Sequence, residues 1–67
     1  MNILTKREKQ IFELLVSHYS TSEIAYSLNI SEKTVRNHIS NVIQKLGVSS
    51  RIQAVLELIR LDELKIK

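Results

Sequence analysis

Residues 30–48 place the strongest constraint on the fold, because their sequence, ISEKTVRNHISNVIQKLGV, has a helical period. Four apolar residues recur at intervals of four, three and four positions, which puts them on one stripe of an α-helix. These residues are Val35, Ile39, Val42 and Leu46. The opposite stripe is polar throughout and consists of Lys33, Arg36, Asn37, Ser40 and Gln44. We therefore expect an amphipathic helix that buries its apolar stripe and leaves its polar stripe free for other contacts.

The rest of the chain also favours helices. It contains no proline, a single glycine and no sustained alternation of apolar and polar residues, so strands are not expected. Helix-capping patterns then divide the chain. Thr5 followed by Glu8 predicts a first helix over about residues 6–18, and Ser20 followed by Glu23 predicts a short second helix that ends near Leu28.

The third and fourth helices are bounded in the same way. Ser31 is a suitable N-cap for the third helix, and Gly47, the single glycine, is expected to end it in a left-handed conformation. Ser50 followed by Gln53 predicts a third capping box, which starts a last helix that runs to about Leu64. The predicted fold is all-α, with four helices in a single domain over residues 1–67.

A tight turn joins the second and third predicted helices. Only Asn29, Ile30 and Ser31 connect them, which predicts a helix-turn-helix. Such a turn usually needs one residue with positive φ, and Asn29 belongs to the few non-glycine types that tolerate it. Ala25 is small enough to let the two helices cross closely. An ordinary helical hairpin within an all-helical bundle is the alternative that this spacing leaves open.

The distribution of charge favours a polyanionic partner. Lysine and arginine outnumber acidic residues by 10 to 7, and no acidic residue lies between Glu32 and Glu57. The positively charged residues in that window are Lys33, Arg36, Lys45 and Arg51. We therefore expect one region of the surface to be selectively positive.

Size and the absence of certain features limit the setting. A domain of 67 residues buries only roughly 60% of the surface that its unfolded chain exposes, so association with a partner is expected. There is no cysteine, and no apolar N-terminal run long enough for a signal peptide or a membrane span. We expect a cytoplasmic protein without a membrane partner.

The polar stripe of the third helix points to the kind of polyanion. A merely solvated helix face usually carries acid–base pairs four residues apart, but this stripe has no acid after Glu32. Its Arg, Asn, Ser and Gln side chains have donors and acceptors that match base edges in the major groove. Double-stranded DNA is therefore the partner that this helix predicts.

Two segments together resemble the LuxR-type helix-turn-helix family, and most closely its stand-alone GerE-like transcription regulators. They are LTKREKQIFELL and TSEIAYSLNISEKTVRNHISNVIQKLGVSSRIQAV, and the resemblance runs over about residues 3–61. It implies a motif over about residues 21–40, a recognition helix over about 32–46 and a dimer helix over about 51–64. It further implies a self-contained homodimeric bacterial regulator without a receiver or acyl-homoserine-lactone-binding domain, with RNA polymerase as a further candidate partner.

The resemblance also assigns roles to particular residues. The positions that read bases in the family correspond to Arg36, Asn37 and Ser40, with Lys33 close enough to help. The positions that bind phosphates correspond to Thr21, Ser22, Thr34, His38 and Lys45, and Arg51 borders the same region.

The predicted fourth helix carries two apolar stripes, although a small domain can bury only one of them by itself. The first stripe consists of Ile52, Val55, Leu56 and Ile59, and we assign it to the core of the domain. The second consists of Ala54, Leu58 and Leu61. This second stripe suggests the same helix of another copy as its partner. The predicted dimer interface is therefore Ala54, Glu57, Leu58 and Leu61.

Other functions have little support in the sequence. The chain has no glycine-rich phosphate loop and no nucleophile paired with a base, so we expect neither an enzyme nor a cofactor. His18 and His38 lack companion ligands, so no metal is expected, and Tyr19 and Tyr26 are expected at the edge of the core. Two alternatives to a dimeric regulator remain: a promoter-recognition module like region four of a sigma factor, and a protein-interaction module that acts on the transcription machinery.

Overall fold

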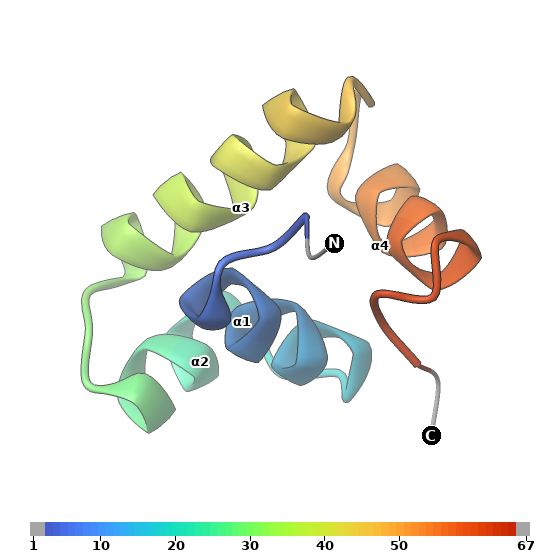
Figure 1. Cartoon of the computed structure of the whole chain (residues 1–67). Coiled ribbons are helices and arrows are strands. Elements are labelled where there is room, and N and C mark those ends of the chain that lie inside the picture. Colours follow the sequence, from blue (N-terminus) through green and yellow to red (C-terminus); the bar gives the residue numbers. More distant parts are fainter. Residues whose placement is uncertain (1–2, 66–67) are drawn as a thin grey trace.

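Four α-helices form the secondary structure of residues 3–65, the part of the chain that the computed structural model describes. They are α1 (Lys6–Val16), α2 (Thr21–Leu28), α3 (Glu32–Leu46) and α4 (Arg51–Arg60). Helix α3 runs along one edge of the molecule, with α1 and α2 beneath it and α4 beyond its C-terminal end (Figure 1). The predicted all-α fold is confirmed.

The apolar stripe of α3 lies at the centre of the packing. Val35 and Val42 are completely buried and Ile39 is nearly so. Helix α3 packs against α1, α2 and α4, so its stripe meets side chains from all three. The largest of these completely buried partners are Ile11 and Phe12 of α1, Ile24 of α2 and Leu58 of α4.

A serine or threonine hydroxyl accepts a backbone N–H at the start of each helix. Thr5 and Ser20 form the predicted capping boxes, in which Glu8 and Glu23 return a hydrogen bond to the backbone of the capping residue. Ser31 and Ser50 cap α3 and α4 through their hydroxyls. The predicted third box is only half formed, because the Gln53 side chain accepts from the N–H and hydroxyl of Ser49 instead of from Ser50.

The helices also end in a common way, with a left-handed residue shortly after each one. These residues are His18, Asn29, Gly47 and Asp62, with φ of 71°, 57°, 69° and 61°. In each case the next residue donates its N–H to a carbonyl five positions back, as Tyr19 does to Leu14 and Ile30 does to Ala25. This pattern satisfies carbonyls that the helix end leaves without a partner.

Two predicted helix ends were too late for this reason. The first helix ends at Val16 rather than near residue 18, because His18 is left-handed. The last helix ends at Arg60 rather than near Leu64, because Asp62 is left-handed and reverses the chain. The reversal returns Leu64 to the core, where it is 3% exposed.

One buried polar contact joins α1 to α3. The Glu8 carboxylate is buried, and its Oε1 lies 2.7 Å from Nζ of Lys45 in the last turn of α3. Oε1 also accepts a hydrogen bond from the Thr5 N–H at 2.9 Å. The Lys45 ammonium group donates in addition to the Ile3 carbonyl at 3.0 Å. This cluster holds the segment before α1 against the C-terminal end of α3.

The same contacts determine how Glu8 titrates. Burial by itself raises the pKa of the Glu8 carboxyl. The hydrogen bonds from Lys45 and the Thr5 backbone, with the nearby ammonium charge, outweigh burial and bring the pKa below its ordinary value of 4.5. The charged form is therefore the one that the folded state favours.

Replacing His18 with glycine should stabilise the protein. A side chain in the left-handed region is strained, whereas glycine adopts that conformation freely but loses more entropy on folding. We expect His18→Gly to raise the free energy of unfolding by up to about 1 kcal/mol in urea denaturation followed by circular dichroism. Ser17→Gly is the matched control and should lower stability, because Ser17 has a negative φ of −85°. Equal losses in both variants would contradict the strain at His18.

Replacing Lys45 with alanine should destabilise the fold. The change leaves the buried Glu8 carboxylate without its cation, which costs about 1–3 kcal/mol of unfolding free energy. Lys33→Ala, on the exposed face of α3, should change stability little.

The cost of Lys45→Ala should depend on pH. Because the folded pKa of Glu8 lies below 4.5, the pair stabilises fully above about pH 4.5, and this contribution is lost as the pH falls through the folded pKa. The stability difference between the wild type and Lys45→Ala should therefore shrink in urea titrations below pH 4.5. A difference that stayed constant down to pH 2.5 would show that the charge of Glu8 is not involved.

Candidate nucleic-acid interface

The turn between α2 and α3 fixes the angle between these two helices. Asn29 has φ 57° and ψ 46°, which confirms the predicted left-handed turn residue. The Asn29 N–H donates to the Tyr26 carbonyl at 3.3 Å, and the Ile30 N–H donates to the Ala25 carbonyl at 3.0 Å. Ala25 is 6% exposed, so the small residue predicted at the helix crossing is buried. The two helices and their turn form a helix-turn-helix.

The first turn of α3 is held by its own hydroxyls. The Ser31 Oγ accepts the Thr34 N–H at 3.0 Å, and the Ser31 and Thr34 hydroxyls lie 2.9 Å apart. Thr34 is half-buried. Its hydroxyl, to which the family resemblance assigns a phosphate, already has the hydroxyl of the N-cap residue Ser31 as a partner.

The four predicted base-reading residues share the exposed side of α3, and we call them the recognition face. They are Lys33, Arg36, Asn37 and Ser40, and all are exposed. The Arg36 Nη1 lies 3.6 Å from Oε1 of Glu32, one turn earlier on the same helix. Asn41 is a further exposed polar residue of α3 that the sequence reasoning missed, although it lies four residues after Asn37, one helical turn on.

The predicted phosphate-binding residues differ in how free they are. Ser22 at the start of α2 and Arg51 at the start of α4 are exposed, whereas Thr21 and His38 are half-buried. Lys45 is occupied by the Glu8 carboxylate and the Ile3 carbonyl. The Glu8–Lys45 pair gives Lys45 a structural role that needs no phosphate contact.

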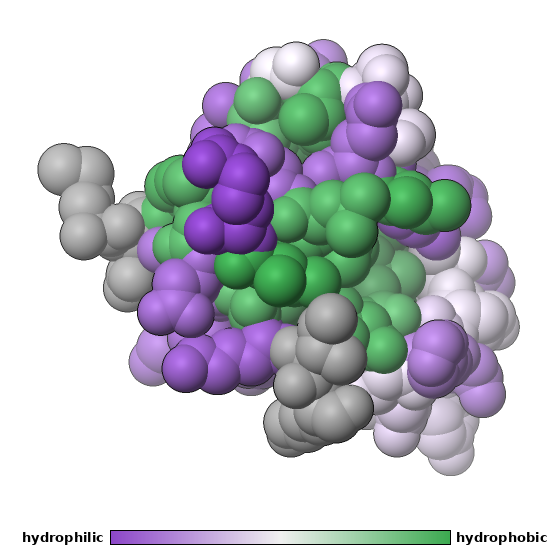
Figure 2. Space-filling model, turned by 90° about the vertical axis from the view of Figure 1, so that its right-hand side faces the viewer, coloured by the Kyte–Doolittle hydropathy of each residue, from purple (hydrophilic) through white to green (hydrophobic). Residues whose placement is uncertain are grey.

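The assignment of the two apolar stripes of α4 was wrong. Ala54 and Leu58, expected at a dimer interface, are completely buried within the chain. Ile52 and Leu56, expected in the core, are 71% and 60% exposed. The reason is that α4 packs on α3 through its Ala54 and Leu58 side. Figure 2 views the molecule from the side on which α4 lies, and it shows apolar side chains gathered on the outer surface there.

The other members of the predicted dimer interface lie between these extremes. Leu61 and Glu57 are half-buried. The Glu57 Oε1 accepts a hydrogen bond from Arg60 Nε at 2.9 Å, and this contact lowers the pKa of Glu57. We define the α4 surface as the exposed or half-buried apolar residues of the helix: Ile52, Val55, Leu56 and Ile59.

Tyr26 also departs from expectation. It was expected at the edge of the core but is 91% exposed on α2, whereas Tyr19 is 42% exposed. Helix α2 buries only Ile24 and Ala25. Tyr26 lies on the side of this short helix that faces solvent.

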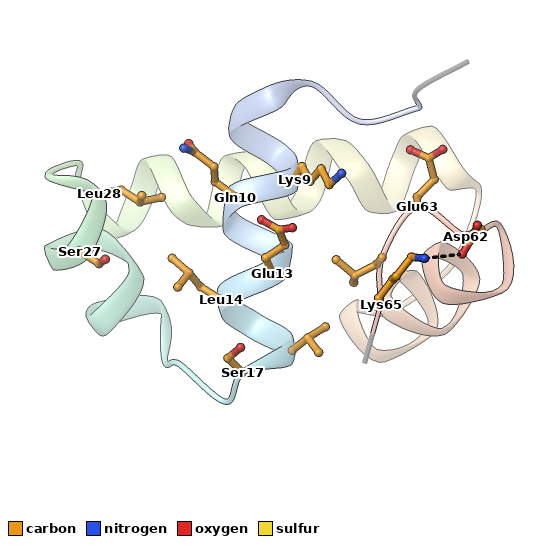
Figure 3. Close-up of a pocket in the computed structure, with 12 residues that line it drawn as sticks. Lys9, Gln10, Glu13, Leu14, Ser17, Ser27, Leu28, Asp62, Glu63 and Lys65 are labelled. Atoms are coloured by element: carbon orange, nitrogen blue, oxygen red, sulfur yellow. Dashed lines mark ion pairs between the residues drawn. The ribbon is translucent and has the colours of Figure 1, made fainter. Parts of the chain in front are cut away.

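A groove of about 580 Å³ opens between α1, the end of α2 and the segment after α4. In Figure 3, α1 lies in front of α3, so the groove is separated from the recognition face. Its lining mixes charged and apolar side chains, such as Glu13, Leu14 and Leu28, and Asp62 and Lys65 form an ion pair of 3.9 Å at its rim. None of the predicted site residues lines it.

Within residues 3–65, no helix is both long and apolar enough to cross a membrane. No three His, Asp or Glu side chains of the same range gather as a metal-binding cluster.

A helix-turn-helix whose second helix presents an exposed, acid-poor polar face is the arrangement found in DNA-binding domains of transcription regulators. Comparison with known proteins makes the assignment specific. The chain belongs to the luxR family of bacterial regulatory proteins, whose family model matches residues 2–58. The members of this family are transcription regulators rather than enzymes.

Individual relatives agree with the family. The chain is 64% identical over 64 residues to the spore germination protein GerE of Bacillus subtilis (strain 168), a match that covers 96% of this chain and 86% of that protein. It is 45% identical over 67 residues to the transcriptional regulatory protein DegU of Brevibacillus brevis, of which it spans only 28%.

A solved structure supports the same assignment. The structure of the transcription factor GerE matches with a TM-score of 0.97 and 64% identity, over 100% of both chains. The predicted family and fold are confirmed, and the chain is a GerE-like transcription regulator with a LuxR-type helix-turn-helix domain.

Proposed function

We propose that this protein binds specific double-stranded DNA sites as a homodimer and inserts α3 into the major groove. One observation carries the proposal: the helix-turn-helix supports an exposed face of α3 that offers arginine, asparagine and serine and has no acid after Glu32. In helix-turn-helix proteins the second helix contacts base edges with its N-terminal half. The recognition face lies in the corresponding part of α3.

The residues of the interface divide into two groups. The recognition face reads base edges, with Arg36 as its strongest member because arginine can donate two hydrogen bonds to one guanine. The proposed phosphate contacts come from Thr21, Ser22, Thr34, His38 and Arg51. Lys45 can contact a phosphate only if its ammonium group shares that contact with Glu8 or gives Glu8 up.

The α4 surface supports the proposal of a homodimer. Ile52 and Leu56 are large apolar side chains of α4 that are 71% and 60% exposed. A second copy of α4 could cover them around a two-fold axis, where each copy uses the same surface. A dimer would join two half-site contacts, each weak by itself, into one tight contact. RNA polymerase is the second proposed partner. This proposal is based only on the role of the family in regulating transcription.

Arg36→Ala should change both affinity and specificity. Loss of a two-pronged contact to a guanine costs about 1–3 kcal/mol of binding free energy and relaxes the preference at one base pair per half-site. The measurement is selection from a randomised duplex library, followed by titration of the selected and scrambled duplexes. Arg51→Ala is the control, because loss of a phosphate contact should weaken both duplexes alike and lower the salt slope by about one. Unchanged selectivity at every position in Arg36→Ala would exclude Arg36 as a base reader.

A salt series on the wild type tests the function itself. Contacts to phosphates release counterions, so affinity for duplex DNA should fall steeply as salt rises. A protein-interaction module that does not touch DNA would show no such binding.

Leu56→Lys should separate the dimer from the fold. Leu56 is exposed, so the charged side chain should leave the helices intact, while two lysines would face each other across the proposed axis. Analytical ultracentrifugation should show a monomer, and circular dichroism should show unchanged helicity. Leu58→Lys is the contrasting variant and should unfold, because Leu58 is completely buried and its charge would have no partner. A Leu56→Lys protein that sediments as a dimer would place the interface elsewhere.

A further inference from the structure

Glu32 is the acidic residue of α3, and it lies beside the recognition face. Its side chain is 49% exposed, and its Oε1 lies 3.6 Å from the Arg36 guanidinium, whose side chain is 57% exposed. The exposed charges at this N-terminal end of α3 are Lys33, Arg36 and Glu32. The acid therefore offsets one of the two positive charges on the face proposed to enter the major groove.

The contribution of Glu32 to the fold is small. A carboxylate in the first turn interacts favourably with the positive end of the helix dipole. An exposed acid–base pair four residues apart stabilises a helix only slightly. The first-turn acids of α1 and α2, Glu8 and Glu23, close capping boxes. In α3 the corresponding third position is Thr34, which bonds to Ser31, so Glu32 does not close a box. The Glu32 carboxylate instead faces the Arg36 guanidinium.

The position of Glu32 disfavours non-specific binding to DNA. A helix N-terminus attracts any phosphate through its dipole and unpaired N–H groups, and non-specific binding to DNA is almost entirely electrostatic. A carboxylate in the first turn of α3 opposes this attraction. Its Oε1 also lies 3.6 Å from Arg36 Nη1, so a phosphate must compete with this carboxylate for the guanidinium.

A matching site can compensate for the same carboxylate. In the proposed complex Arg36 donates to a guanine, and Glu32 lies one helical turn earlier on the same side of α3. Its carboxylate would then accept from the N4 amino group of a cytosine in the adjoining base pair, because cytosine N4 is the donor that a carboxylate matches. A site without cytosine at that position leaves the carboxylate facing the DNA without a donor. The repulsion is thus offset at a matching site and remains at all others.

We infer that Glu32 is a specificity-determining residue, which restrains Arg36, weakens binding to non-matching DNA and selects a cytosine beside the guanine that Arg36 reads. This inference rests on the proposed function, since it needs α3 in the major groove. It assigns to Glu32 the discrimination between sites, and to Arg36 the larger share of affinity.

Three variants test the inference. Glu32→Gln removes the charge but keeps an acceptor, Glu32→Ala removes both, and Glu13→Gln makes the same charge change on the exposed side of α1, at the groove away from the recognition face. Circular dichroism should confirm that all three remain helical. Each is titrated at low salt with a duplex selected from a randomised library by the wild type and with its scrambled counterpart.

Glu32→Gln should bind the scrambled duplex roughly 3- to 10-fold more tightly than Glu13→Gln does, and the advantage should fade as salt screens the charge. Its preference for the selected duplex over the scrambled one should fall by a similar factor. Library selection with Glu32→Ala should lose the cytosine preference at one position per half-site, next to a retained guanine.

The outcomes separate the inference from the function on which it rests. If the wild type shows no salt-dependent binding to duplex DNA, the proposed function fails. If the wild type binds but Glu32→Gln matches Glu13→Gln on the scrambled duplex, Glu32 does not oppose non-specific contacts and the inference is overturned. It is equally overturned if Glu32→Ala selects the same bases as the wild type at every position.

Discussion

The burial of one stripe of α3 is the interaction on which the rest of the structure depends. Val35, Ile39 and Val42 are the surface against which α1, α2 and α4 all pack. A helix is only about 10 Å wide, so three neighbouring helices could easily surround it. One side of α3 stays uncovered because all three neighbours pack on the other side. They do so in Figure 1, and the recognition face remains exposed as a result. The core and the proposed DNA contact are therefore two sides of the same helix.

The Glu8–Lys45 contact restricts the rotation of α3 about its own axis. Apolar contacts alone would tolerate small rotations of α3 about its axis, whereas a buried carboxylate accepts only an arrangement that keeps its cation within hydrogen-bond distance. Such a rotation would turn Arg36 and Asn37 away from the side of α3 that is proposed to face DNA. A polar contact at the far end of α3 thus helps to fix the orientation of the residues proposed to read bases.

The sequence predicted most of the fold because its signals were local. Hydroxyl caps at Thr5, Ser20 and Ser31 and the left-handed Asn29 depend on residues within a few positions of each other, so their pattern can be read directly. The α4 surface could not be assigned in this way. Ile52 with Leu56, and Ala54 with Leu58, have the same spacing, so periodicity gives two stripes without saying which faces α3. A small residue one turn from a large one, as in Ala54 and Leu58, suits close helix packing. This pattern identifies the buried stripe of α4 only when the position of α3 is known.

The pairing of Lys45 with Glu8 escaped the sequence for a different reason. The two residues are 37 positions apart, and a lysine near the end of a recognition helix is an equally good phosphate contact. The exposure of candidate site residues was therefore predicted well where it follows from the helical period, as for Arg36 and Ser40. It was predicted poorly where a charge finds a partner in a distant part of the chain.

The buried positions of Leu4 and Leu64 bear on how this fold can be moved between proteins. Both lie outside the helices, before α1 and after α4, yet they are only 7% and 3% exposed and belong to the same core as Phe12. A chimera cut at the helix boundaries, 6 and 60, would remove both side chains and open the core at two points. The transplantable unit is therefore the stretch from 4 to 64, and any junction to a foreign sequence belongs outside it.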